Sequence, residues 1–512
     1  MSSLKARPRA ARASARSTPR PGTLEPGTEI PDTPRTMLLH LLLHTLTLAA
    51  PLAANGGSST PPPPPADHVL LLVLDDIGMD AVSCYPGAAP DARTPVLDGL
   101  AARGVRFDRV WSNPACSPTR ATLLTGRYGF RTGVGSVKAL GDGGLRPEEV
   151  SLAESLREDR PDLHTAFFGK WHLGPNEDQG PVAQGFERFR GTSGNLRVKT
   201  RPRPYFEYDE RSGRSTETST RERYATSAVV DDALEAIQEY GQDPWLVIAS
   251  FHAAHTPFHA PPEDLHTRAL GGSPKLQARE HFMAMVDALD REIGRLLEGI
   301  PAEILERTQV IVLSDNGTAS KAQFKERPLR LGKGSLFEDG IRVPMISAGP
   351  AVIDPGRVSS ALINTTDVFA TIHELLGARP APEAVDSISF QGELSGRPRA
   401  ARKWVFAERF QSEPPPSRWP AVDRFTVTDG RFKLTVDVLG DSERLHDLSA
   451  DPEERVNLLN GAEISEDARQ ARQALEEVVE RSLDRASVMA ARASAGSPVE
   501  PTSEKPPQGS DR

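Results

Sequence analysis

Acidic side chains follow two apolar runs of the sequence, at the point where each run ends. Asp75 and Asp76 come directly after HVLLLVL, and Asp315 and Asn316 come directly after TQVIVLS. Two adjacent carboxylates behind a buried strand repel each other unless a cation neutralises them. Carboxylate and amide oxygens are ligands that calcium and magnesium take. Alone, Asp-Asp is usually a solvated loop and Asn-Gly a turn, but together the four residues predict a site for a hard divalent cation.

A single cysteine lies in the string CSPTRATLLTG, which starts at Cys116. Pro118 suits the first turn of a helix, so Cys116 is expected at the helix N-terminus, where free N–H groups and the helix dipole favour an anion. Arg120 falls on the same helical face and can hold the same charge. A lone cysteine is more often a small buried hydrophobic residue, which is our interpretation of Cys84. The surrounding string favours a chemical role for Cys116.

Further cations and proton carriers follow two other apolar runs. Lys170 and His172 are two residues apart, so on an extended segment both side chains point to one side. A solvated lysine is the alternative for Lys170, but the apolar FFGKW context favours a buried partner for an anion. His255 ends the run PWLVIASFHAAH and is expected at the same sheet edge. His252 and His259 flank it and are interpreted as structural or substrate-side residues.

The elements that must position these residues alternate between buried strands and helices. Apolar runs at HVLLLVL, HTAFFGKW, PWLVIASF and TQVIVLS are separated by helix-period segments at 148–158, 221–240 and 276–298. This alternation predicts an α/β fold with a large, mostly parallel central sheet flanked by helices. Ligands of such sheets collect at the carboxyl ends of the strands, where the polar residues above are placed.

The sequence also predicts the division of the chain. Residues 67–400 are expected to form the catalytic domain, and 401–490 a smaller domain with an antiparallel sheet and a polar helix from about 464 to 490. Residues 1–66 contain a leader and end in the linker NGGSSTPPPPP, and 491–512 have almost nothing to bury, which predicts a disordered tail.

Composition and charge exclude several classes of function. The chain has 61 basic and 70 acidic residues and a net charge of −9, so nucleic acid is not expected as a partner. Two cysteines cannot form a disulfide framework.

The apolar segment 37–54 resembles the core and cleavage region of a signal peptide and is too short for a membrane span. We therefore expect export to the periplasm or the extracellular space. The alternative is a disordered tail with a chance apolar run. For residues 1–36 we favour a misplaced start with Met37 as the true beginning, over a genuine extension or a transit-like segment.

The string CSPTRATLLTG resembles the signature of the type I sulfatases, arylsulfatase-like enzymes of the alkaline phosphatase superfamily. The resemblance extends over most of the chain, through LDDIG, FGKWHLG, HAAHTPF, LSDNG, GKGSLFEDGIRVP and DLSADPEERVNLL. It implies a sulfuric ester hydrolase with a sulfatase fold and a small C-terminal α+β domain. One departure is Glu338-Asp339-Gly340, where the family commonly has Glu-Gly-Gly, so the loop after Lys333 could differ in shape.

Site residues follow from the resemblance position by position. It implies that a separate formylglycine-generating enzyme oxidises Cys116 to 3-oxoalanine (formylglycine), whose hydrate is the nucleophile. One metal ion, calcium with magnesium as the alternative, is implied at Asp75, Asp76, Cys116, Asp315 and Asn316. The implied catalytic residues are Cys116, Arg120, Lys170, His172, His255 and Lys333. Of these, Arg120 and Lys333 would clamp the nucleophile and the sulfate, His255 or Lys333 would protonate the leaving alcohol, and His172 would release the sulfate.

The expected substrate is a sulfated small molecule or glycan. A phosphonate or phosphate ester hydrolase of the same superfamily is the nearest alternative, and a non-catalytic protein that binds sulfated glycans is another. The polar segment 191–223 is predicted either to contact the substrate or to be a solvated flap.

Overall fold

The structure is a computed structural model. It describes residues 66–137, 144–174, 180–198, 201–215, 217–324, 331–397, 402–410, 424–438, 440–461 and 464–482. These residues fall within one compact unit that spans Pro61–Arg512. The predicted leader up to residue 65, its apolar segment 37–54 and the predicted tail 491–512 lie outside the described residues. In the parts of the chain that are described, every helix is too short or too polar to cross a membrane.

Four parallel strands form the centre of a ten-stranded sheet. In spatial order they are β9 (Thr308–Ser314), β1 (His68–Leu74), β8 (Trp245–Ser250) and β4 (His164–Lys170). Their pairing is in register, with Leu70 opposite Val247 on one side and Val310 on the other. Strands covered on both faces need continuous apolar runs, and β1, β8 and β9 are fully buried. The predicted α/β fold class is confirmed.

The edges of this sheet are mixed in direction. On one side lie β10 (Met345–Ala348), β2 (Val105–Phe107) and β11 (Arg357–Ser359), and on the other β5 (Arg188–Thr192), β6 (Glu207–Ser212) and β7 (Ser219–Glu222). Strand β10 runs antiparallel to both of its neighbours, and so does β6. A separate two-stranded sheet joins β3 (Val110–Trp111) and β12 (Ile363–Asn364).

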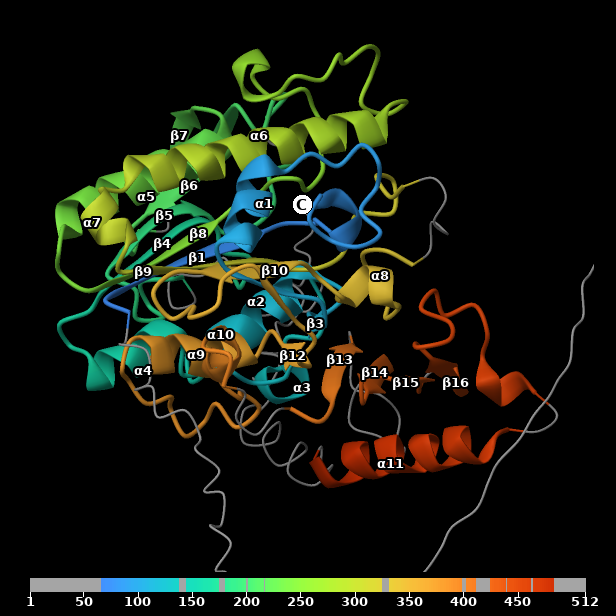
Figure 1. Cartoon of the computed structure of the whole chain (residues 1–512). Helices are drawn as coiled ribbons and strands as arrows, with labels where there is room; N and C mark the ends of the chain where they lie inside the picture. The colour runs from blue at the N-terminus through green and yellow to red at the C-terminus, as the bar shows by residue number, and fades with distance from the viewer. Residues whose placement is uncertain are drawn as a thin grey trace, which may run out of the picture. The chain divides into compact units, whose positions relative to one another are not determined.

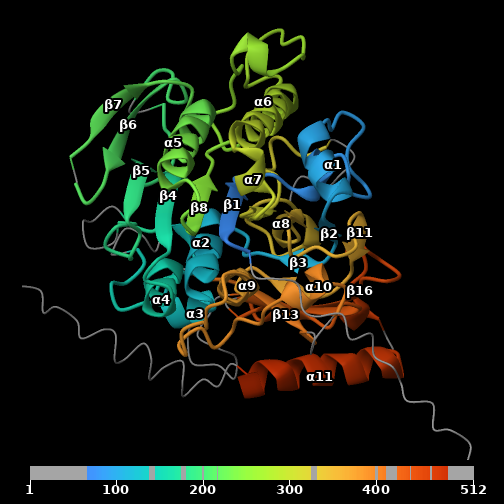
Figure 2. The same ribbon diagram turned by 60° about the vertical axis from the view of Figure 1, so that its left-hand side comes forward.

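Helices cover both faces of the large sheet (Figures 1 and 2). One face packs against α1 (Pro95–Ala102), α5 (Ala225–Tyr240) and α6 (Ala278–Gly299), and their residues share one hydrophobic core. The other face packs against α2 (Cys116–Thr125), α4 (Leu152–Asp159) and α9 (Asp367–Leu375), which share a second core. Short helices complete the unit: α3 (Gly129–Thr132), α7 (Ala302–Leu305), α8 (Glu338–Ile341) and α10 (Gln391–Leu394).

Two predicted helices begin later than the sequence pattern indicated. The helix expected at 148–158 begins at Leu152, because Ser151 caps it and forms a capping box with Glu154. The helix expected at 221–240 begins at Ala225, because the preceding residues belong to β7. Helix α6 differs from the predicted 276–298 by one to two residues at its ends.

An antiparallel four-stranded sheet lies near the C-terminus, as predicted. Its order is β13 (Val405–Arg409), β14 (Arg424–Thr428), β15 (Phe432–Asp437) and β16 (Ser442–Asp447). Helix α11 (Glu466–Ser482) packs on one face, through a core that includes Leu434, Leu445 and Leu475. Residues 483–490 of the predicted helix lie outside the described residues. Strand β16 was not predicted, because only Leu445 interrupts its polar sequence.

Candidate active site and metal centre

The strand order places the polar residues of the sequence motifs at one edge of the sheet. Asp75 follows β1, Asp315 follows β9, His255 lies five residues beyond β8, and Lys170 ends β4. Because β9, β1, β8 and β4 are parallel neighbours, their carboxyl ends meet at the same edge. The candidate site therefore combines residues that are up to about 260 positions apart in the chain, as the hydrogen bond between Lys333 and Asp76 shows.

Each of the three carboxylates in the site is paired with one cation. Lys170 pairs with Asp75, and both side chains are fully buried. The Nζ of Lys333 lies 2.5 Å from Oδ1 of Asp76. Two nitrogens of Arg120 donate to Oδ2 of Asp315, at 3.0 and 2.8 Å. Ions are tolerated in a protein interior when they are paired with an opposite charge. An unpaired buried ion loses its hydration without compensation.

The pKa values of these carboxyl groups diverge. Burial alone would raise the pKa of Asp75, but Lys170 and the neighbouring cations outweigh burial and hold it well below its usual range. Burial and the charge of Asp75 raise the pKa of Asp315, although Arg120 opposes this shift. Opposite pKa shifts are expected of two carboxylates that compete for the same cations, because ionisation of one disfavours ionisation of the other. An additional cation between Asp75 and Asp315 would favour ionisation of both.

Among the described residues, no hydrogen-bond partner is found for one side-chain oxygen of each of two predicted metal ligands. Oδ1 of Asp75 and Oδ1 of Asn316 are buried and accept no hydrogen bond from the described residues. Ligand atoms of Asp75, Cys116 and Asp315 lie within 4.8 Å of one another, as do those of Asp75, Asp76 and His255. Unsatisfied buried oxygens among carboxylates fit a hard divalent cation. The predicted ligand set is therefore brought together, and its chemistry fits calcium.

Cys116 is the first residue of α2, as predicted, and its side chain is 1% exposed. Its Sγ lies 3.9 Å from the Nζ of Lys333. Burial raises the pKa of this thiol, while Lys170 and Lys333 oppose the shift. The sulfur is thus held beside cations at the N-terminus of a ten-residue helix, where negative charge is stabilised.

Arg120 contacts residues that the sequence did not indicate. Besides Asp315, its guanidinium donates to the carbonyl of Lys170 and to Oγ of Ser250. Ser250 ends β8 and also donates to the carbonyl of Lys170, at 2.6 Å. Arg120 therefore ties the ends of three strands together, in addition to contributing positive charge near Cys116. Ser250 has no motif of its own, and only its position at the end of an apolar run could have indicated it.

Lys170 and His172 both lie in the site, but not for the reason that the sequence suggested. The backbone of His172 is left-handed, with φ of 60°, so the segment is not extended there. Asp76 is the other site residue in this conformation, with φ of 63°. Burial, and then Lys170, lower the pKa of His172 well below its usual range, so its imidazole is neutral. Strained backbone at two site residues is typical of functional positions.

His255 lies beside the carboxylates of Asp75 and Asp76. Its Nε2 is 3.9 Å from Oδ2 of Asp76, and its Nδ1 is 2.7 Å from the carbonyl of Thr256. Burial lowers the pKa of His255, and Asp76 opposes the shift. The hydroxyl of Tyr205 donates to the carbonyls of both His252 and His255. Tyr205 is thus a positioning residue that the sequence analysis missed.

The two flanking histidines occupy supporting positions. His252 is 2.7 Å from the hydroxyl of Thr192, and the ring of His259 packs against Tyr205 with a centroid distance of 4.2 Å. Burial lowers the pKa of His259 to about 4. Segment 191–223 supplies Tyr205 and also Gly194, which lies beside the ring of His172. Part of that segment therefore borders the site, and part forms the hairpin of β6 and β7.

The loop after Lys333 is fixed by a buried group of charges. Glu338 pairs with Lys433 at 3.0 Å, and Lys433 also pairs with Glu454 at 2.8 Å. In the sequence Glu338-Asp339-Gly340, the last residue must be glycine for the backbone to pack against Ser335. A Cβ on Gly340 would lie 2.3 Å from the carbonyl oxygen of Ser335. The departure therefore leaves the loop compact.

Neither cysteine forms a disulfide. Cys84 is half-buried, and burial raises the pKa of its thiol to about 12, which agrees with an inert packing role.

The chain is similar in sequence to proteins of known function. Residues 67–378 match the family model described as sulfatase, and residues 331–481 match that of the N-sulphoglucosamine sulphohydrolase C-terminal region. The chain is 31% identical to dog (Canis lupus familiaris) N-acetylgalactosamine-6-sulfatase over 65% of this chain and 67% of that protein. It is 29% identical to human (Homo sapiens) arylsulfatase A, over 77% and 83% of the two chains.

A solved structure shares the fold. It is BT4656 in complex with its substrate D-glucosamine-2-N,6-O-disulfate, which superposes with a TM-score of 0.64 at 20% identity, over 81% of this chain and 97% of that one.

Proposed function

Because the chain belongs to the sulfatase family, and so hydrolyses sulfate esters, we propose that oxidised Cys116 is its nucleophile and a sulfated carbohydrate its substrate. The observation that carries the proposal is the position of Cys116. It begins α2, is 1% exposed, and lies 3.9 Å from Lys333 beside the carboxylates of Asp75 and Asp315. An inert core cysteine needs none of these neighbours.

Oxidation of Cys116 to formylglycine by a separate enzyme would supply, after hydration, a hydroxyl nucleophile that an unmodified thiol cannot replace. Calcium held by Asp75, Asp76, Asp315, Asn316 and residue 116 would make that hydroxyl more acidic. Without metal, the three carboxylates are balanced by Lys170, Lys333 and Arg120. A divalent ion therefore leaves an excess of two positive charges, which favours a bound sulfate ester.

The chain's own residues provide the remaining chemistry. Lys333 can hold a sulfate oxygen at its Nζ, because burial opposes its charge but Asp76 and Cys116 raise its pKa well above the usual range. His255 and Lys333 flank Asp76, so either can deliver a proton to the leaving alcohol. His172 is neutral, and its Nδ1 has no partner among the described residues, so it can accept the proton that is lost when sulfate is released.

Two observations support a carbohydrate substrate. The dog relative is named for N-acetylgalactosamine-6-sulfate chemistry, and the solved BT4656 complex contains a disulfated glucosamine.

Sulfate release, measured by ion chromatography, tests the proposal. Wild-type protein, coexpressed with a formylglycine-generating enzyme, is compared with Cys116→Ala on an aryl sulfate, sulfated sugars and matched phosphate esters. We expect release by wild type only. If Cys116→Ala is as active as wild type, Cys116 is not the source of the nucleophile. Faster hydrolysis of the phosphate esters than of the sulfate esters would favour a phosphoesterase. The mass of the peptide covering residues 110–120 reports separately whether Cys116 has been oxidised.

We also propose that the protein is exported, on the basis of the apolar segment 37–54, which lies outside the described residues. The N-terminal sequence of protein recovered from a secreting host tests this. A mature chain that begins between residue 54 and residue 67 supports export, and retention of Met37 contradicts it.

A further inference from the structure

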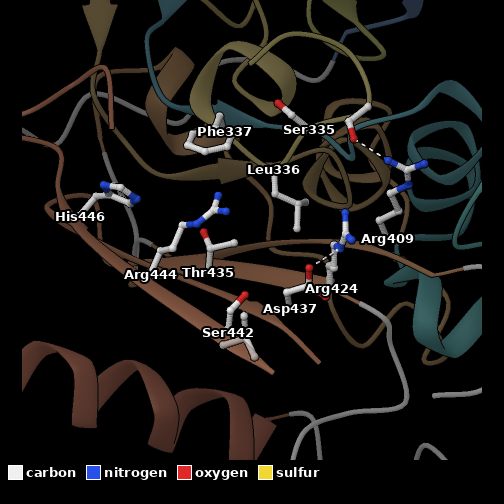
Figure 3. A pocket seen from close by; sticks show the side chains of 12 residues that line it. Ser335, Leu336, Phe337, Arg409, Arg424, Thr435, Asp437, Ser442, Arg444 and His446 are labelled. Atoms are coloured by element: carbon white, nitrogen blue, oxygen red, sulfur yellow. Dashed lines mark hydrogen bonds and ion pairs between the residues drawn. The ribbon is translucent and has the colours of Figure 1, made fainter. Parts of the chain in front are cut away.

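A cavity of about 270 Å³ lies between the C-terminal sheet and the segment that follows Lys333 (Figure 3). Its roof consists of Ser335, Leu336 and Phe337, and its floor and sides carry three arginines. The volume lies just below the range of about 300–1,000 Å³ that is typical of small-molecule sites, which suits a single charged group rather than a whole ligand. None of the roles described for the catalytic residues uses this cavity.

The polar floor follows from the alternation of side chains along two strands. On β15, Phe432, Leu434 and Val436 are buried, and Leu434 packs in the core with α11. The alternate residues Thr435 and Asp437 therefore face the other way, as do Ser442, Arg444 and His446 on β16. The register places Thr435 opposite Arg444 and Asp437 opposite Ser442. The floor is thus a continuous row of polar side chains.

The cavity has an excess of positive charge. Arg424 is neutralised by Asp437, at 2.9 Å, and Asp437 is the only carboxylate among the described lining residues. Arg409 donates to the carbonyl of Gly334 at 2.7 Å. The guanidinium of Arg444 lies 5.5 Å from the centre of the Phe337 ring and pairs with no carboxylate of the described residues. Three arginines against one aspartate leave two positive charges at the walls.

The cavity adjoins the candidate active site through one residue. Gly334 lines the cavity and directly follows Lys333, whose Nζ lies 3.9 Å from the Sγ of Cys116. The amide of Gly334 donates to the carbonyl of Pro114, in the segment that leads into Cys116. Gly334 is therefore held between the nucleophile segment and Arg409.

We propose that this cavity is a subsite for a second anionic group of the substrate, a sulfate or a carboxylate on the part of the saccharide that is not cleaved. The inference rests on the proposed sulfatase function and narrows its substrate class to saccharides with at least two negative groups. Arg444 and Arg409 are the residues that bind the second group, because a planar guanidinium matches the oxygens of sulfate and carboxylate. Phe337, whose ring faces Arg444 from the roof, would pack against the sugar ring.

Binding to full-length Cys116→Ala protein with calcium tests the cavity without turnover. Calorimetry compares a monosulfated disaccharide of neutral sugars with the same disaccharide carrying further sulfates, and with a monosulfated disaccharide in which the second sugar is a uronic acid. We expect the multiply charged ligands to bind at least about 10-fold more tightly, as for charged hydrogen bonds. The Arg444→Gln change should abolish this preference, and Arg444→Lys should retain part of it.

Arg431→Gln is the matched control. Arg431 lies beside the same sheet, is 52% exposed and pairs with Asp447 outside the cavity. Equal binding of all ligands would overturn the proposed subsite. So would a preference for multiply charged ligands that survives in Arg444→Gln and falls in Arg431→Gln. A stronger effect of the carboxylate than of the added sulfates would identify the second group as a uronic acid. If the preference is present but matured wild-type protein releases no sulfate, the proposed function fails while the anion subsite stands.

Discussion

The Nζ of Lys333 lies 3.9 Å from the Sγ of Cys116 and 2.5 Å from Oδ1 of Asp76. One ammonium group thus connects the nucleophile position with a ligand of the candidate metal centre. A divalent cation held by Asp76 would compensate the charge of that carboxylate, and Lys333 would then be able to bind an oxygen of the substrate. The ion pair with Asp76 holds Lys333 beside Cys116.

Replacement of Lys333 should impair catalysis more than folding. We expect Lys333→Gln to lower kcat/KM for an aryl sulfate by about 100-fold or more, since loss of one preorganised charge contact costs that much. Lys321→Gln, an exposed lysine in the same β9–α8 connection, is the control. Steady-state kinetics with calcium present measure the effect. A loss below about threefold would exclude a direct role for Lys333.

Removal of the metal should abolish activity, and calcium should restore it. The buried oxygens of Asp75 and Asn316 have no other described partner, so Asn316→Ala should weaken calcium binding by about 10-fold or more. Titration calorimetry of chelated protein measures this affinity independently of turnover. Asn460→Ala, at an exposed position, should bind calcium normally. Unchanged calcium affinity in Asn316→Ala would contradict the ligand assignment.

Tyr205→Phe tests the positioning of His255. The hydroxyl donates to the carbonyls of His252 and His255, at 2.5 and 2.7 Å, and its loss should let the His255 backbone shift. We expect kcat to fall about 10-fold for alkyl sulfates and much less for nitrophenyl sulfate, whose good leaving group needs little protonation. Tyr240→Phe, at the end of α5, should show no such split. An equal loss with both leaving groups would indicate a structural role only.

Lys433 should be necessary for stability. It is fully buried between Glu338 and Glu454, so Lys433→Met would leave Glu454 without its counter-ion among the described residues and Glu338 with only Arg342, at 3.6 Å. The cost of breaking a buried ion pair is about 3–5 kcal/mol in the free energy of unfolding. Urea unfolding at neutral pH measures it. The triple variant Lys433→Met, Glu338→Gln, Glu454→Gln should regain much of the loss, and the exposed Lys403→Met should lose little. If Lys433→Met is as stable as wild type, the carboxylates of Glu338 and Glu454 are hydrated rather than buried without compensation.

Stability should fall in weak acid through buried histidines such as His373. Its Nδ1 donates to the carbonyl of Phe369 and its Nε2 accepts from Ser155, so the folded protein holds the neutral ring. Burial lowers the pKa of His373 from 6.5 to about 4. Between these values the unfolded chain binds more protons, so stability falls as the pH drops from 6.5 to 4.

Urea midpoints at several pH values measure this dependence. Wild-type protein should lose free energy of unfolding between pH 6.5 and pH 4, and His373→Gln should make this loss smaller by as much as about 3 kcal/mol. His266→Gln, at a partly exposed position, is the control. An identical slope in His373→Gln and wild type would contradict the assignment.

The sequence by itself indicated the fold class and the predicted ligands and cations of the candidate site, but not Tyr205 or Ser250. Runs such as those of β1 and β9 are apolar throughout, and this pattern is compatible only with strands that are covered on both faces. The polar residues that end these runs, Asp75 and Asp315 among them, had to meet at one edge once the strands were parallel. The CSPTR string marked Cys116 as the start of a helix, because a proline suits only its first turn.

Tertiary structure alone decided which groups pair. Arg120 is on the same helix as Cys116, yet its guanidinium contacts Asp315, because α2 packs under the ends of β9 and β8. Tyr205 reaches His255, and Arg444 reaches Phe337, across connections that no local pattern encodes. Hydrophobic periodicity specifies which face of an element is buried, through free energies summed over many residues. The partner of a single polar side chain depends on strand order and register, which only the folded chain fixes.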